Sequence, residues 1–420
     1  MLLLHLPTKG RPERFLRTAR QWVAAARGDC WRMNVAVENS DGPTLAAAAE
    51  LAEGLGARVQ ITRHAGKSKI AAFNAFPADG WDILALIAED YECPVEGWDL
   101  IIARDMDAHF PAMDGVLHYF DGFTGGPGLC THPVAGVNYV RRFGWLHNPA
   151  YRDAFSDDEM TAVSARMGKR VFIGQPVATH AWIGRRPDAV FRASQEAFSQ
   201  DKQTFLASVA AGFYLRQPTL SVLIPTLVSR RSAFGQLTEE LHRQIFELPD
   251  PGRVEIQYLS DCYQLTAGQK RQKLLGMARG EYVAFVDDDD AVAADYVAAI
   301  LDAIDHGNSP DCVVFAGRYA VDGVDYGRTD FDLEHRVYAN HARRYLRSPN
   351  HLCPVRAELA RRVGFSEANC GEDSDYARRL LPLLRTQAVC RGADGGKRVL
   401  YRYQFSPAGT ATQRVLEVRR

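Results

Sequence analysis

The stretch Tyr282–Asp290 reads YVAFVDDDD, an apolar run that ends in four consecutive aspartates. So short an apolar run predicts a buried strand, and the carboxylates then lie at its carboxyl end. Adjacent carboxylates repel one another, so their desolvation requires a cation. Oxygen ligands favour Mg²⁺ or Mn²⁺, which commonly bridges protein carboxylates and substrate phosphates. The alternative is an acidic turn that caps a helix over Ala293–Ile304, with Asp290 or its neighbour as N-cap.

Length and composition narrow the class of protein. A chain of 420 residues predicts two domains, and a net charge of −1 indicates neither a nucleic-acid nor a membrane partner. The eight cysteines show no zinc-binding spacing, which predicts a reducing, cytoplasmic location. The apolar opening is too short for a signal peptide, and no apolar run approaches the ~18 residues that span a bilayer.

Strands and helices alternate along the first half of the chain. Helices are expected over Arg14–Ala26 and Leu45–Leu55. The expected strands, each followed by a polar stretch, are Leu2–Leu6, Met33–Val37, Arg58–Thr62 and Asp82–Ala88. The last of them runs into Glu89-Asp90-Tyr91-Glu92, a second junction of strand and acids. The alternation predicts a doubly wound, mostly parallel sheet.

The same order of features begins again after Pro218, which follows a predicted helix over Asp188–Phe213. Matched positions are 218 residues apart for Thr8 and Thr226, and 220 apart for Asp41 and Asp261. Asp158 and Asp373 are 215 apart. An internal duplication explains this repetition, and it predicts domains over 1–215 and 216–420.

The ordered set of strand-Pro-Thr, strand-Ser-Asp, basic helix start, strand-DDDD and Gly-Glu-Asp resembles family 2 glycosyltransferases. The resemblance is closest over Leu220–Tyr403, which includes NHLCPVRAELARRVGF and GEDSDYARRL, and weaker over Leu3–Phe213. It implies an α/β fold of two tandem GT-A-type domains. It also implies transfer of a sugar from a nucleoside-diphosphate sugar, most commonly a UDP-sugar, to a hydroxyl, with Mn²⁺ or Mg²⁺ holding the diphosphate.

In the second half the resemblance implies a complete site. The expected donor-binding residues are Thr226, Arg230, Asp261, Lys270, Arg271, Asp287 and Asp288. Asp261 is placed to accept hydrogen bonds from a nucleobase, or it caps a turn. Asp289 is the expected direct metal ligand, with Asp287 and Asp290 beside it. Lys270 and Arg271 either meet the phosphates or are solvated.

The pair Glu372-Asp373 matches the family's Glu-Asp pair, and it makes Asp373 the expected base of an inverting displacement. The alternative is an N-cap box for a helix over Asp375–Leu384, to which Glu372 and Ser374 are equally suited. Asn350 and His351 either touch donor or acceptor or are structural.

In the first half the acidic junction lacks a clean DxD. Asp90 matches the final metal aspartate, His180 is the expected additional metal ligand, and Asp157 or Asp158 then takes the place of the base. The expected donor-binding residues are Thr8, Lys9, Arg11, Asn39, Asp41, Lys67 and Lys69. The alternative is a degenerate copy kept for packing or acceptor binding.

Two other classes of function remain open from the sequence: a sugar- or nucleotide-binding scaffold, and a nucleotidyltransferase, whose glycine-rich, lysine-bearing first loop is missing here. The acceptor is equally open among a glycan, a lipid-linked sugar, a protein and a hydroxymethylated DNA base of the phage type. The run Arg336–Arg347 (RVYANHARRYLR) either follows a phosphate backbone or a lipid headgroup or, as is commoner for such runs, forms a solvated helix face. Only if this run flanks the Asp373 cleft do we expect a nucleic-acid acceptor.

Overall fold

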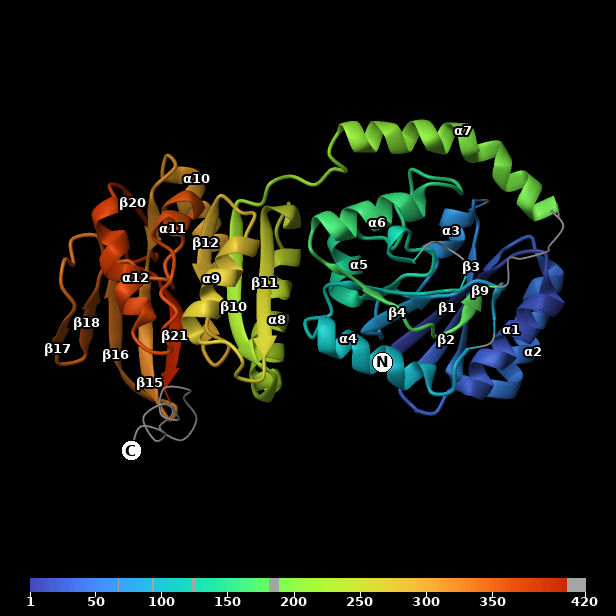
Figure 1. Cartoon of the computed structure of the whole chain (residues 1–420), viewed down its shortest axis with the longest axis horizontal. Coiled ribbons are helices and arrows are strands. Elements are labelled where there is room, and N and C mark those ends of the chain that lie inside the picture. Colours follow the sequence, from blue (N-terminus) through green and yellow to red (C-terminus); the bar gives the residue numbers. More distant parts are fainter. Residues whose placement is uncertain (67, 93, 123–125, 181–188, 406–420) are drawn as a thin grey trace. The chain divides into compact units, whose positions relative to one another are not determined.

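A computed structural model describes residues 1–66, 68–92, 94–122, 126–180 and 189–405. The chain divides into two compact units, Met1–Leu215 and Arg216–Arg420. Figure 1 colours the first unit blue to green and the second yellow-green to red. Each unit has its own central sheet, and each is described by itself.

The first unit is built on a seven-stranded sheet of order β3-β2-β1-β4-β7-β6-β8. Its strands are β1 (Leu2–Thr8), β2 (Trp31–Glu38), β3 (Val59–His64), β4 (Ile83–Leu86), β6 (Val116–Tyr119), β7 (Val134–Gly136) and β8 (Arg170–Ile173). Only β7 runs antiparallel to its neighbours β4 and β6. Two short strands outside this sheet, β5 (Tyr91–Glu92) and β9 (Thr179–His180), pair antiparallel with each other.

Helices cover both faces of the first sheet. They are α1 (Pro12–Ala25), α2 (Gly42–Leu55), α3 (Lys69–Phe73), α4 (Trp98–His109), α5 (Val137–Phe143), α6 (Ser156–Arg166) and α7 (Ala189–Ala210). Leu4 and Leu6 of β1 pack in one core cluster with Trp22 of α1, and Leu3 packs in the other with Met160 of α6. Successive side chains of a strand point to opposite faces, so a continuously apolar β1 is buried on both sides.

The second unit repeats this arrangement in a six-stranded sheet of order β11-β10-β12-β19-β14-β20. Its strands are β10 (Leu220–Leu227), β11 (Val254–Asp261), β12 (Tyr282–Phe285), β14 (Cys312–Val314), β19 (Val355–Arg356) and β20 (Gln387–Val389). As in the first unit, the first strand lies between two parallel partners, and one antiparallel strand, here β19, follows. The two sheets therefore share one topology, and β3 adds a strand to the first.

The second unit also has a second sheet, of six strands in the order β13-β21-β15-β16-β18-β17, where the first unit has the two-stranded pair of β5 and β9. Its strands are β13 (Ala291–Val292), β15 (Ala316–Val321), β16 (Val324–Phe331), β17 (Ala339–His341), β18 (Arg344–Arg347) and β21 (Val399–Phe405). The helices of this unit are α8 (Arg231–Phe246), α9 (Ala267–Met277), α10 (Tyr296–His306), α11 (Ala357–Val363) and α12 (Glu372–Leu380).

The predicted α/β class with mostly parallel central sheets is confirmed, whereas three local predictions are wrong. The run Arg336–Arg347 is not helical, because β18 pairs with β16 and β17. Helix α10 begins only at Tyr296 with Asp295 in the N-cap position, so Asp290 caps nothing. Helix α12 begins at Glu372, ahead of the predicted start. In the part of the chain that the structure describes, no helix is long and apolar enough to cross a membrane.

Candidate active site

The aspartates that follow β12 lie beside a cavity of about 900 Å³ in the second unit. Its walls come from the ends of β10 and β12, the first turns of α9 and α12, and one face of the second sheet. The sequence-predicted residues that line it are Thr226, Arg230, Lys270, Arg271, Asp287, Asp288, Asp289, Asn350, His351, Glu372 and Asp373. Asp261 and Asp290 are predicted site residues that do not line it.

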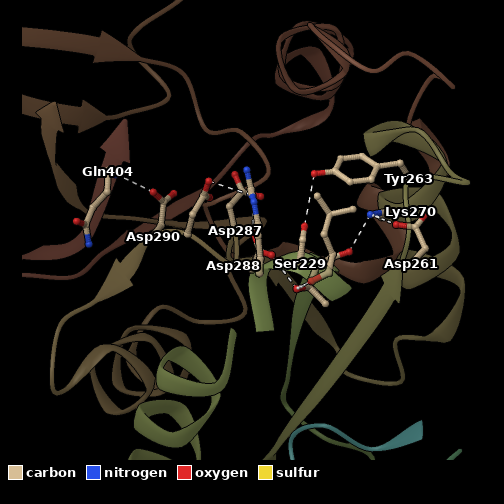
Figure 2. Close-up of polar contacts among 12 residues, drawn as sticks. Ser229, Asp261, Tyr263, Lys270, Asp287, Asp288, Asp290 and Gln404 are labelled. Atoms are coloured by element: carbon tan, nitrogen blue, oxygen red, sulfur yellow. Dashed lines mark hydrogen bonds and ion pairs between the residues drawn. The ribbon is translucent and has the colours of Figure 1, made fainter. Parts of the chain in front are cut away.

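Asp288 is held by the first strand and by the residues that follow it. Thr226 donates its hydroxyl hydrogen to Asp288 Oδ2 across 2.7 Å. Arg230 NH1 donates to Asp288 Oδ1, also across 2.7 Å, and lies 2.9 Å from Asp289 Oδ2. The Asp288 side chain is buried, so these two contacts fix the carboxylate where the strand ends (Figure 2).

Arg271 joins the two acidic motifs of the sequence. Its guanidinium donates to Glu372 Oε1 and, across 2.6 Å, to Asp287 Oδ1. The Nε2 atom of His351 lies 3.2 Å from the same guanidinium. Arg271 is buried, and an arginine shared by two carboxylates is the geometry in which a buried charge is compensated. This predicted phosphate-binding residue therefore connects β12 to α12 in the structure.

Carboxylates outnumber cations in this site. Asp287, Asp288, Asp289 and Glu372 share the two arginines Arg230 and Arg271. Burial, opposed by Arg230 but reinforced by Asp288 and Asp287, raises the pKa of Asp289 to about 6. An all-oxygen donor set with uncompensated negative charge fits a hard divalent cation, and Asp289 and Asp287 are the side chains that would hold it.

Asp290, expected beside the metal, has another role. Its Oδ2 accepts from Tyr401 Oη across 2.6 Å. Its Oδ1 accepts from the backbone N–H of Gln404 across 2.7 Å (Figure 2). Burial and the charge of Asp287 raise its pKa well above the ordinary value. Because both oxygens bind groups of β21, Asp290 attaches this strand to the site.

Asp261 ends β11 as expected, but its carboxylate pairs with Lys270 Nζ and accepts from the N–H of Leu265 across 2.7 Å. Lys270 Nζ also donates to the carbonyl oxygen of Thr226 across 2.8 Å. Figure 2 shows this lysine between the ends of the two strands. Asp261 thus positions Lys270, and Lys270 is the one of the pair that lines the cavity.

Asp373 faces the cavity from the first turn of α12. The N-cap residue of this helix is Gly371 at φ 80°, and no side chain caps the helix. The capping alternative for Glu372 is therefore wrong, because Glu372 pairs with Arg271. The Asp373 Oδ1 atom accepts from the N–H of Ser374 across 2.7 Å, which leaves Oδ2 for another partner.

The first unit repeats the contacts of Asp288 with different residues. Thr8 donates its hydroxyl hydrogen to Glu89 Oε1, and Arg11 NH1 lies 3.3 Å from Glu89 Oε2. Glu89 therefore corresponds to Asp288. The next residue, Asp90, corresponds to Asp289, in agreement with the match made from the sequence.

Asp90 lies in a cluster with His132 and His180, and ligand atoms of the three side chains are all within 4.8 Å of one another. The Nε2 atom of His180 is 3.7 Å from Asp90 Oδ1. Burial lowers the pKa of His132 to about 3, so its ring is neutral and able to bind a metal. Thr131 Oγ1 contacts His132 Nδ1 at 3.1 Å and donates to Asp121 Oδ2, which orients the ring.

The other predicted residues of the first unit do not gather at this cluster. Lys9 pairs with Glu38, and Lys69 Nζ lies 3.7 Å from Asp153. Asp41 caps α2 by accepting from the N–H of Thr44, and it also accepts from Gly10.

Two further candidates of the first unit have local contacts, and a third lies outside the described residues. The backbone N–H of Asn39 donates to His64. Asp158 stands with Asp157 in the first turn of α6, where burial and that neighbour raise its pKa. Lys67 is the candidate that lies outside the described residues.

Sequence reasoning missed His132 and Tyr263. His132 lies in the loop before β7, far along the chain from both partners, and no motif marks it. Tyr263 lines the cavity two residues after Asp261, with 52% of its surface exposed. Its φ of 66° lies in the left-handed region, which is unusual outside glycine and frequent at functional sites.

The match to a protein-family model lies within the second unit. Residues 236–367 match the model of Glycosyl transferase family 2. No curated protein matches the sequence.

Similar solved structures include TarS residues 1–349 from S. aureus in complex with UDP-GlcNAc, at 16% identity and a TM-score of 0.34, covering 44% of this chain and 58% of that chain. The mannosyltransferase PcManGT from Pyrobaculum calidifontis, in complex with GDP-Man and Mn²⁺, gives 13% identity and a TM-score of 0.41, covering 50% and 64%. Glucosyl-3-phosphoglycerate synthase from Mycobacterium tuberculosis gives 12% identity and 0.36, covering 50% and 79%. The chain thus spans 58% of the length of the first of these relatives.

Proposed function

We propose that this chain is a family-2-like glycosyltransferase with GT-A-type α/β domains, and that its second unit moves a sugar from a nucleoside-diphosphate sugar to a hydroxyl. One observation carries the proposal: the carboxylates of Asp287, Asp288 and Asp289 and the Glu372-Asp373 pair face one cavity of about 900 Å³, joined through Arg271. A metal-dependent inverting transferase needs a cation site for the leaving diphosphate and a base for the acceptor beside one cavity.

In this site Asp289 and Asp287 would hold the divalent ion. When bound, Mn²⁺ or Mg²⁺ neutralises charge that develops on the leaving diphosphate. Asp288 shapes the strand end through Thr226 and Arg230, and Lys270 presents its ammonium to the phosphates. The exposed ring of Tyr263 offers a stacking surface to the nucleobase.

Asp373 is the base. The acceptor hydroxyl oxygen forms a bond to the anomeric carbon, and the bond from that carbon to the diphosphate oxygen breaks. The electron pair leaves with the diphosphate, and the hydroxyl proton passes to Asp373. Attack from the face opposite the leaving group inverts the anomeric configuration. Glu372 keeps Arg271 in place and so positions the base.

The first unit is proposed as a second metal-dependent donor site, with Asp158 or Asp157 in the place of the base. The observation that favours it over a degenerate copy is the cluster of Asp90, His132 and His180. Two imidazoles and one carboxylate suit a transition ion such as Mn²⁺ better than Mg²⁺, which prefers oxygen ligands. The two units would then differ in metal preference.

The test is calorimetric titration with UDP, GDP and their sugars, with and without Mn²⁺, on wild type, Asp90→Ala and Asp289→Ala proteins. Two metal-dependent sites, each lost with its own aspartate, support two donor-binding units. One site, lost only in Asp289→Ala, restricts donor binding to the second unit. Absence of any nucleotide binding would contradict the transferase proposal.

A binding scaffold is the alternative that titration does not separate. Donor binding without turnover is its signature, and Asp373→Asn would then change nothing. Loss of sugar transfer in Asp373→Asn with donor binding retained excludes it.

A further inference from the structure

One wall of the cavity is aromatic. Tyr319 of β15 stacks on Tyr403 of β21, with ring centroids 5.5 Å apart and planes 18° from parallel. Tyr345 of β18 meets Tyr319 edge-on at 5.4 Å. All three line the cavity, together with Tyr338. A cluster of tyrosine faces and edges beside a catalytic carboxylate binds ring-shaped ligands, whether sugars or bases.

A single arginine completes this wall. The Arg347 guanidinium lies 4.7 Å from the ring centre of Tyr338 and 5.6 Å from that of Tyr345. It donates to the carbonyl oxygens of Ala339 and Leu346 and to the side chain of Asn340, all uncharged acceptors. Across the described ranges of the chain, no carboxylate pairs with it, whereas the site's other cations each pair with one.

Burial of the guanidinium lowers the pKa of Arg347, since no nearby carboxylate compensates for the lost hydration. A half-buried cation with only neutral acceptors has an unsatisfied preference for an anion. Its place on the cavity wall makes a ligand the partner that can reach it.

Two other arginines of the 336–347 run, Arg343 and Arg344, do not extend this charge along the cavity. Arg344, on the opposite face of β18, pairs with Asp330 at 3.2 Å. Arg343 is exposed and donates to the backbone of Asp325. The run therefore flanks the Asp373 cleft only through Tyr338, Tyr345 and Arg347, so the cleft side offers one anion site and a stacking surface.

We propose that the acceptor is a ring compound that carries one phosphate, its ring against Tyr319 and Tyr345 and its phosphate on Arg347. This inference rests on the proposed function of the same cavity, with the attacked hydroxyl on or beside the ring and its proton passing to Asp373. The phosphorylated ring has two sources: a free sugar phosphate, or a nucleotide monomer.

The test compares phosphorylated and unphosphorylated rings by calorimetry, with UDP and Mn²⁺ saturating so that the donor site is filled. The probes are glucose 6-phosphate against glucose, and thymidine 5′-monophosphate against thymidine. In the wild-type protein, one phosphorylated probe should bind at least tenfold more tightly than its unphosphorylated counterpart. The pair that shows this difference identifies the source of the phosphorylated ring. Arg347→Gln should abolish that difference, and Tyr319→Ala should weaken both members of the pair about tenfold.

The matched control is Arg344→Gln, which removes the same charge from the other face of the same strand and should leave both affinities unchanged. Equal binding of the paired probes, or no binding of either pair, overturns the inference. So does an Arg347→Gln effect confined to UDP affinity, which would assign the arginine to the donor. Binding of oligothymidylate would also overturn the inference if its affinity fell with salt as expected for the release of several counterions. That result would indicate a surface that follows a nucleic-acid strand.

Failure of this inference is separable from failure of the proposed function. UDP binding that requires Mn²⁺ and Asp289 tests the donor site without any acceptor. A protein that binds UDP but shows no phosphate preference keeps the transferase proposal and loses only the acceptor assignment.

Discussion

Thr226 donates its hydroxyl hydrogen to Asp288 across 2.7 Å and so ties the end of β10 to the strand end that carries the acidic motif. Thr8 makes the same contact with Glu89 in the first unit. The two halves thus share a contact as well as a topology, although glutamate has replaced aspartate. Positions of the two sites can be matched through this pair, and Asp90 and Asp289 then correspond.

Replacing Asp373 with asparagine should lower the rate of sugar transfer about 10²- to 10⁴-fold, because the acceptor hydroxyl loses its base. Affinity for the donor should stay within a factor of about two, since the asparagine is isosteric. Steady-state kinetics and calorimetry measure the two quantities. The control is Asp375→Asn, on the same helix, whose carboxylate pairs with Arg378 and Arg379 away from the cavity. A transfer rate that survives Asp373→Asn would assign the base elsewhere.

Replacing Arg271 with glutamine should destabilise the second unit by about 3–5 kcal/mol, because Asp287 and Glu372 would lose the buried charge that they share. Urea unfolding followed by circular dichroism measures the change. All six tryptophans lie at or before position 182, so tryptophan emission reports the first unit alone and should be unaffected. Arg243→Gln removes a surface cation paired with Glu240 and Glu247 and should change little. An equal loss of stability in Arg271→Gln and Arg243→Gln would refute the role of Arg271 as a bridge between Asp287 and Glu372.

Mn²⁺ binding to the first unit should depend on His132. In an Asp289→Ala background, which removes the predicted ligand of the second unit, His132→Gln should weaken Mn²⁺ about 10- to 100-fold. Electron paramagnetic resonance of free Mn²⁺ gives the affinity without any assay of turnover. His109→Gln, at the exposed end of α4, is the control. Undiminished affinity in His132→Gln would leave Asp90 and His180 as the protein ligands.

Acid should destabilise the first unit. Burial lowers the pKa of His5 and of His118 to about 4, from an ordinary value near 6.5. The unfolded chain therefore takes up protons first as the pH falls, so stability is complete above about pH 7 and is lost toward pH 4. Each of the two histidines should lower the free energy of unfolding of the first unit by about 2 kcal/mol between pH 7 and pH 5.

Tryptophan emission during urea unfolding at the two pH values measures this loss. His118→Phe keeps a ring against Phe172 and should remove about 2 kcal/mol of the acid sensitivity. The exposed His109, replaced by glutamine, serves again as the control. A first unit equally stable at pH 5 and pH 7 would show that these histidines are accessible to protons in the folded state.

Patterns along the chain were sufficient for much of this description. The apolar runs of β1, β4, β10 and β12 and the turns between them predicted alternating strands and helices, because periodicity and turn chemistry are local properties. The repeated order of motifs predicted which acids and hydroxyls end neighbouring strands. Parallel strands present their carboxyl ends at one edge, so Thr226 and Asp288 had to lie close together.

Only the tertiary structure showed which side chains from different segments of the chain come into contact. Antiparallel pairing of β5 with β9 brings His180 to Asp90, and the loop before β7 adds His132. Attachment of β21 to the site occupies Asp290, and strand pairing of β18 places Arg347 on the cavity wall while Arg344 faces away. Local sequence determines which segments form strands, but which side chains meet depends on partners and register contributed by other, often distant, segments of the chain.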